Sequence, residues 1–75
     1  MITELESVVL TVDLPDHRLR QGDIGTVVLN HANRGYEVEF VTLGGETLAV
    51  VSLAPEQLRP VGHGEIAHVR PVEAA

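Results

Sequence analysis

Tyr36-Glu37-Val38-Glu39-Phe40 alternates strictly between apolar and acidic residues. Successive side chains of a β-strand point to opposite faces of its sheet, so a period of two predicts one apolar face and one acidic face. The apolar face would carry Tyr36, Val38 and Phe40, and the acidic face Glu37 and Glu39. This stretch therefore predicts a half-buried strand with a solvated acidic side.

Turn-forming residues separate this strand from two other strand-forming runs. Gly44-Gly45 predicts a tight turn, because glycine adopts positive φ at little cost, and it would join the strand to Thr47–Leu53 as a hairpin. On the other side, an Asn- and Gly-rich turn at residues 31–35 follows the β-branched run Ile24–Asn30. Because Thr47–Leu53 is apolar on both faces, we expect it to be a central or covered strand.

Three prolines mark the limits of the domain's remaining elements. Pro15 cannot donate to a strand ladder, so a first strand over residues 7–12 should end before it, ahead of a polar arm at residues 16–21. Pro55 is preset for the first position of a short helical turn. A brief fifth strand would follow at residues 58–61, and Pro60 confines it to a sheet edge.

These elements predict an all-β fold, a small five-stranded SH3-like barrel over residues 1–61. It has a long arm after the first strand and a short helical turn before the fifth. An OB-type barrel is the alternative, but it usually has longer strands and an intervening helix. Residues 62–75 read as a C-terminal tail that is either partly disordered or pairs with an edge strand, within the chain or across a dimer.

Three further segments occur in a characteristic order around the alternating strand. Residues 8–15 read Val-Val-Leu-Thr-Val-Asp-Leu-Pro, residues 22–28 read Gly-Asp-Ile-Gly-Thr-Val-Val, and residues 58–61 read Leu-Arg-Pro-Val. With the strand at 36–40, this pattern resembles a small bacterial family that is known only as a domain of unknown function. The resemblance covers residues 8–61 and implies an SH3-like barrel with no established activity.

The amino-acid composition argues against several classes of function. The 75 residues carry 11 acidic and 5 basic side chains, giving a net charge of −6, which disfavours a nucleic-acid partner. Tyr36 and Phe40 are the two aromatic residues, too few for a base-stacking platform, and there is no cysteine for a disulfide or a zinc thiolate. Since no stretch resembles a signal peptide or a membrane-spanning helix, we expect a cytoplasmic protein without membrane contact.

Catalysis is not expected from the polar side chains of the arm. His17 beside Asp16 could act as a general base or a metal ligand, with Asp13 and Asp23 nearby in sequence. However, an arm is less rigid than catalysis usually requires. We therefore predict no catalytic residue, no metal ligand and no cofactor. Arg59 is expected to form a structural ion pair with Asp23 or Glu56.

The acidic side chains are the candidate partner-binding site. The predicted set comprises Glu37, Glu39 and Glu46 around the hairpin, with Asp13 and Asp16 on the arm. Such a face either keeps the protein soluble and guards a sheet edge, or docks a basic protein surface.

The leading hypothesis is a non-enzymatic acidic module that binds a basic protein partner, of the antitoxin or immunity type. One alternative is a nucleic-acid or ribosome-associated module that uses residues 22–26 with Arg18 and Arg20. The other is a structural accessory that forms a homo-oligomer through edge strands or the tail.

Overall fold

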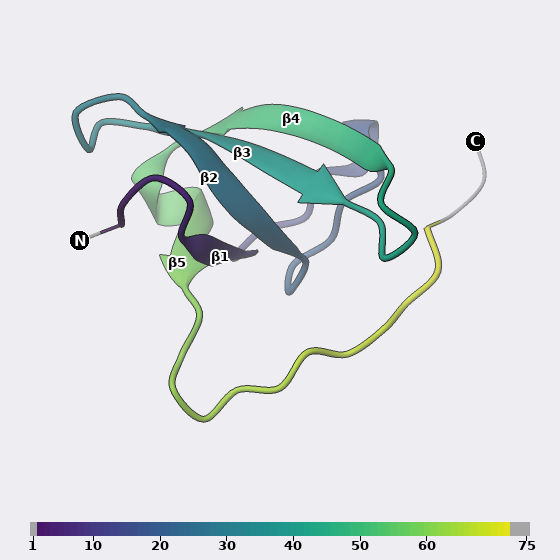
Figure 1. Ribbon diagram of the computed structural model, residues 1–75. Coiled ribbons are helices and arrows are strands. Elements are labelled where there is room, and N and C mark those ends of the chain that lie inside the picture. Colours follow the sequence, from purple (N-terminus) through teal and green to yellow (C-terminus); the bar gives the residue numbers. More distant parts are fainter. Residues whose placement is uncertain (1, 73–75) are drawn as a thin grey trace.

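The computed structural model describes residues 2–72, and it folds into one antiparallel sheet with two 3-10 turns (Figure 1). The elements are β1 (Ser7–Leu10), η1 (Pro15–His17), β2 (Ile24–Asn30), β3 (Tyr36–Val41), β4 (Thr47–Leu53), η2 (Pro55–Gln57) and β5 (Leu58–Pro60). The strand order is β4-β3-β2-β1-β5, and every pair is antiparallel. The all-β, five-stranded prediction is confirmed, including the helical turn before the fifth strand. Met1 and residues 73–75, the ends of the predicted domain and tail, lie outside the described residues.

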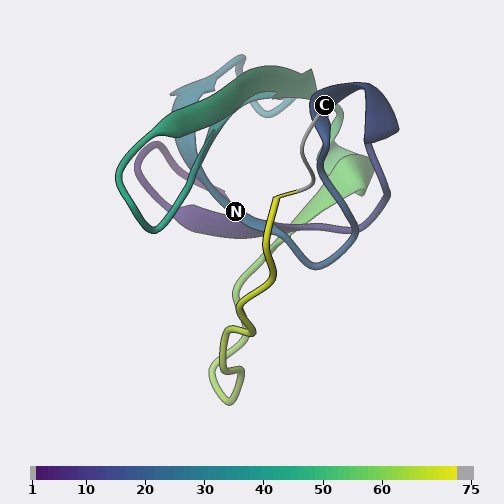
Figure 2. The same ribbon diagram turned by 90° about the vertical axis from the view of Figure 1, so that its right-hand side faces the viewer.

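The sheet curls back on itself, as Figure 2 shows, and its buried side chains form a single core cluster. On β3, the side chains of Tyr36, Val38 and Phe40 are 5%, 0% and 3% exposed, which is the burial that their alternation predicted. The other core residues are Ile2, Val8, Leu10, Leu19, Val27, Val51, Leu53 and Leu58. All of them precede Arg59, so residues 62–72 add nothing to the buried cluster. We call residues 2–60 the sheet domain.

The prediction that Thr47–Leu53 is central or covered is wrong, because β4 is an edge strand of the sheet. Its inward residues Val51 and Leu53 are 8% and 3% exposed, whereas the outward Val50 is 54% exposed. An apolar residue at an outward position hides the period of two. The strand therefore reads as buried on both faces although one face is open.

The arm between β1 and β2 is anchored to the core. Leu14 and Leu19 exchange backbone hydrogen bonds of 2.9 and 3.1 Å around η1, and Leu19 is 3% exposed. Arg18, which ends η1, has a φ of 59° in the left-handed region. The arm is thus a closed loop that places the Leu19 side chain in the core.

Residues 62–72 form neither helix nor strand and run back along the sheet domain (Figure 1). Within the described part of the chain, no helix has the length and apolar character needed to cross a membrane. We call residues 62–72 the tail.

Candidate functional site

Glu37 is held in place on the outward side of β3. Its Oε2 accepts a hydrogen bond of 2.6 Å from the Ser52 hydroxyl on β4 and lies 3.0 Å from Nε2 of His31. Ser52 stands opposite Glu37 in the β3–β4 register, so the sheet itself provides this contact. The Ser52 hydrogen bond and the neighbouring His31 lower the pKa of Glu37 below its ordinary value.

Glu39 is held in a similar way two residues further along β3. Its Oε2 accepts a hydrogen bond of 2.7 Å from the Thr47 hydroxyl at the start of β4. Residues two apart on a strand share a face, so the carboxylates of Glu37 and Glu39 lie side by side. Hydroxyl donors from β4 thus orient both carboxylates on one open face.

Half-exposed apolar side chains surround these two carboxylates. Val50 stands opposite Glu39 on β4 and is 54% exposed. On β2 the register shifts beside Glu37, between Val27 and Leu29, and leaves Val28 and Leu29 exposed. Val41 extends the surface at the end of β3. We define the β3 face as Val28, Leu29, Glu37, Glu39, Val41 and Val50.

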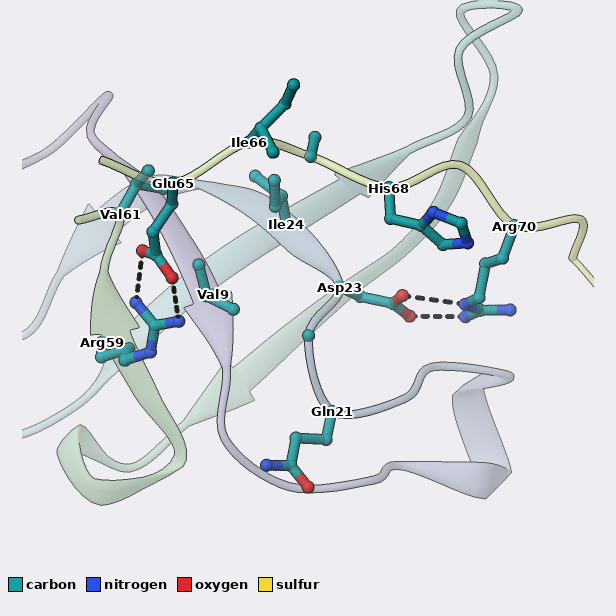
Figure 3. A pocket seen from close by; sticks show the side chains of 12 residues that line it. Val9, Gln21, Asp23, Ile24, Arg59, Val61, Glu65, Ile66, His68 and Arg70 are labelled. Carbon is teal, nitrogen blue, oxygen red and sulfur yellow. Dashed lines mark hydrogen bonds and ion pairs between the residues drawn. The ribbon is translucent and has the colours of Figure 1, made fainter. Parts of the chain in front are cut away.

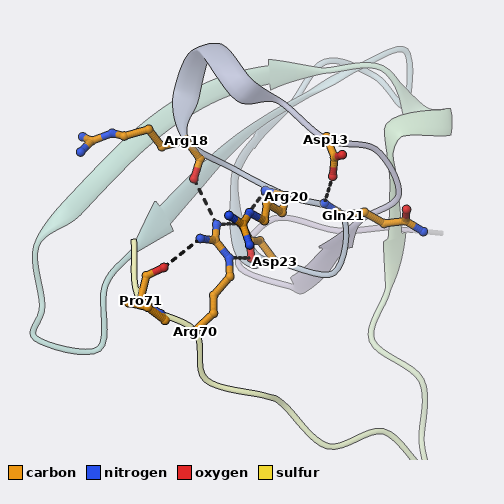
Figure 4. Close-up of polar contacts among 7 residues, drawn as sticks. All are labelled: Asp13, Arg18, Arg20, Gln21, Asp23, Arg70 and Pro71. Carbon is orange, nitrogen blue, oxygen red and sulfur yellow. Dashed lines mark hydrogen bonds and ion pairs between the residues drawn. The ribbon is translucent and has the colours of Figure 1, made fainter. Parts of the chain in front are cut away.

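The remaining predicted binding residues lie on other elements. Glu46 is exposed in the β3–β4 turn, next to Thr47. Asp13 accepts a 2.8 Å hydrogen bond from the backbone N–H of Gln21, so its carboxylate braces the arm (Figure 4). Asp16 is exposed in η1. The structure therefore brings Glu37 and Glu39 together, with Glu46 on the adjoining turn, and places Asp13 and Asp16 on the arm.

An ion pair between Asp23 and Arg70 attaches the far end of the tail to the sheet domain (Figure 4). Arg70 Nε donates to Asp23 Oδ1 at 2.9 Å and Nη2 donates to Oδ2, while Nη2 also donates to the Arg18 carbonyl oxygen at 3.1 Å. The Arg70 and Asp23 side chains are 21% and 18% exposed. This pair joins residues 47 apart, and no sequence spacing indicates it.

Asp23 is also the anchor of its own turn. The backbone N–H of Arg20 donates to Asp23 Oδ2 at 2.8 Å, and the Asp23 N–H donates to the Arg20 carbonyl oxygen at 3.0 Å. Burial of the Asp23 carboxyl raises its pKa, but the Arg70 and Arg20 hydrogen bonds and the charges of both arginines outweigh this effect. The net result is a lowered pKa.

The expectation that Arg59 pairs with Asp23 or Glu56 is wrong, because its partner is Glu65 in the tail (Figure 3). Both guanidinium contacts, Nη1 to Oε1 and Nη2 to Oε2, measure 2.7 Å. The Arg59 hydrogen bonds, together with the Gly62 backbone N–H, lower the pKa of Glu65 to about 2. Asp23 pairs with Arg70 instead, which contacts both of its carboxylate oxygens.

The described residues show no arrangement suited to metal binding: no group of three or more His, Asp or Glu side chains in 2–72 could hold an ion. His17 is exposed at the end of η1.

The chain is similar to other proteins over its sheet domain. A family model described as a domain of unknown function, DUF4926, matches residues 4–60, which is most of the chain and stops short of the tail. No curated protein and no solved structure matches. The predicted resemblance to a family of unknown function is confirmed, and the chain belongs to the DUF4926 family.

Proposed function

We propose that this protein is a non-enzymatic module that docks a basic protein through the β3 face. One observation supports the proposal most: two carboxylates, fixed by hydroxyls of β4, lie among half-exposed apolar side chains. Interfaces combine an apolar contact area with a small number of oriented polar groups, and this face offers both.

Orientation of the two carboxylates favours binding. A side chain that is already held loses less conformational freedom when a partner's arginine or lysine engages it. The net charge of −6 would also speed the approach of a basic partner, since complementary charge mainly raises association rates. The partner's matching surface would therefore carry arginine or lysine beside apolar residues.

A neutralising role is the specific form of this proposal. Surface carboxylates can imitate phosphate charge, so the β3 face would cover the basic cleft of a nuclease or a translation-associated enzyme, in the manner of an antitoxin or immunity protein. Such a protein would act beside its target in the cytoplasm.

The test is an affinity capture from the native host with matched charge variants. The wild-type chain should retain one basic protein in stoichiometric amount, and the double substitution Glu37→Lys with Glu39→Lys should lose it. A control with the same charge change, Glu4→Lys with Glu56→Lys, alters no residue of the β3 face and should retain it. If both variants lose the captured protein equally, binding depends on net charge and not on the β3 face. Recovery of ribosomes or RNA would overturn the proposal in favour of a nucleic-acid module.

Self-association is a second candidate because β4 is an open edge beside the β3 face. An exposed edge strand can pair with the same edge of another copy. Light scattering over a wide concentration range separates the two: a strict monomer removes this candidate, and a dimer lost on Val50→Lys supports it.

A further inference from the structure

The tail passes over the sheet domain with two of its apolar side chains, Ile66 and Val69, turned to solvent. Ile66 is 95% exposed and Val69 is 70% exposed. Two hollows lie between the tail and the sheet domain, of about 310 and 530 Å³. A tail that belonged to the core would fill such spaces, because protein interiors are close-packed. This tail spans them.

The larger hollow is a groove with apolar walls. On the sheet domain it is lined by Leu19, Ile24, Phe40, Val41, Leu43 and Leu48. Its polar groups include Asp23 and Glu46, and part of the tail also lines it. Leu43, at 89% exposed, shows how open the apolar wall is toward solvent. We call this space the Asp23 groove.

The Asp23 carboxylate is arranged to receive a guanidinium group. The Arg20 N–H orients the carboxylate, and the Arg18 carbonyl oxygen adds a further acceptor for the same guanidinium (Figure 4). Paired N–H donors on a carboxylate are the geometry that distinguishes arginine from lysine. Asp23 lies within the residues that match the family, whereas Arg70 lies beyond them.

We propose that the Asp23 groove binds an extended segment of a partner protein that presents an arginine between apolar residues. The tail shows the required chemistry, because Val69-Arg70-Pro71-Val72 places such an arginine on Asp23 with no helix or strand around it. In the free protein the tail lies across the groove, with Arg70 on Asp23 in place of the partner's arginine. The groove and the β3 face share Val41 at their border, but the Asp23 carboxylate is distinct from those of Glu37 and Glu39, so either proposal can fail without the other.

For a partner segment to bind, the tail must first leave Asp23. The tail beyond Glu65 is attached through Arg70, while Ile66 and Val69 gain little from the docked position. A tethered segment competes at an effective concentration on the order of millimolar, so an outside segment must bind better or gain contacts elsewhere. A partner segment that also filled the apolar hollow would have this advantage.

The experiment uses full-length ¹⁵N-labelled protein and an acetylated peptide with the sequence of residues 66–72 as the probe. In the Arg70→Gln variant the cis arginine is absent, so the peptide should bind at least about tenfold more tightly than to the wild type. The shifted amides should be those of Gly22, Asp23 and Ile24. The same peptide with glutamine in place of its arginine should not bind.

Two outcomes would overturn the proposal. One is that the arginine and glutamine peptides bind Arg70→Gln alike, or that neither binds. The other is that wild-type chains exchange tails and form a dimer that Arg70→Gln abolishes, which would make the occupant a second copy. Adding Asp23→Asn to Arg70→Gln should remove peptide binding. The glutamine peptide tests the same arginine–Asp23 contact from the side of the peptide. The conclusion therefore does not depend on whether the double variant folds.

Discussion

Gly25 and Val38 are so close across the β2–β3 pair that a Cβ on Gly25 would stand 2.6 Å from Val38 Cγ1. The same Cβ would stand 2.8 Å from Cε1 of Phe40. All three residues are buried. The glycine in the Gly-Asp-Ile-Gly-Thr segment is therefore required by packing, as the core side chains of β3 occupy the space where a side chain would be.

Replacing Gly25 by alanine should destabilise the fold. Overpacking a core costs about 1–3 kcal/mol, and in a domain of this size each kcal/mol lowers the melting temperature by about 4–8 °C. Thermal unfolding followed by circular dichroism measures this loss. Gly44→Ala is the matched control, because its Cβ would meet only the Thr42 hydroxyl oxygen at 3.8 Å. Equal melting temperatures for the two variants would contradict the packing argument.

Two leucines test where the core lies. Leu10 is 2% exposed and Leu43 is 89% exposed, so truncating them removes very different amounts of buried surface. Leu10→Ala should cost about 2–5 kcal/mol of unfolding free energy, whereas Leu43→Ala should be close to neutral. Urea unfolding at constant slope gives both values. A large loss from Leu43→Ala would mean that the β3–β4 turn is covered in solution.

The status of β4 as an edge strand predicts a contrast between neighbouring residues. Val50→Lys should leave the melting temperature nearly unchanged, because Val50 is 54% exposed and the ammonium group stays in water. Val51→Lys would bury an unpaired charge at a site that is 8% exposed and should abolish folding. If Val50→Lys also unfolds the protein, something covers the outer face of β4.

The sequence predicts the structure correctly where a local pattern or a single proline determines it. The alternation at 36–40 marks a half-buried strand, and Pro55 and Pro60 mark the helical turn and the short edge strand. The prediction fails for β4, because Val50 is apolar and exposed and so hides the period of two.

The tail contacts were beyond sequence reasoning for a different reason. A surface arginine pairs with whichever carboxylate the fold brings near, and Asp23 and Arg70 meet only after the tail has run back along the sheet. The β3 carboxylates could be assigned to one face from their spacing, but their Ser52 and Thr47 donors depend on the β3–β4 register.

The hydroxyl of Ser52 should set the titration of Glu37. Its hydrogen bond is the largest cause of the lowered pKa of Glu37, so Ser52→Ala should raise that pKa toward its ordinary value. Carboxyl ¹³C shifts recorded against pH measure the change at Glu37 directly. Thr47→Val is the control. The Thr47 hydroxyl donates to Glu39, so its removal should leave the titration of Glu37 unchanged. An unchanged Glu37 midpoint in Ser52→Ala would mean that the hydroxyl contact is not kept in solution.

Acid should release the tail before it unfolds the sheet domain. The pKa values of Asp23 and Glu65 are both lowered in the folded protein, that of Glu65 to about 2. Carboxylates with lowered pKa values stabilise a contact above their ordinary pKa of about 4, and this contribution is lost as the pH falls through the lowered values. Backbone amide shifts of residues 65–71 should therefore begin to move below about pH 4.

The order of the two events follows from where the carboxylates lie. Among residues 2–72, none of the members of the buried core cluster is Asp or Glu. Protonating Asp23 and Glu65 therefore removes the tail's ion pairs and leaves the apolar contacts around Val38 in place. Arg59→Gln removes the main cause of the lowered Glu65 pKa, so Glu65 should then titrate at higher pH while Asp23 keeps its midpoint. If core amides such as that of Val38 shifted together with those of the tail, the tail would be part of the cooperative fold and the Asp23 groove would open only on unfolding.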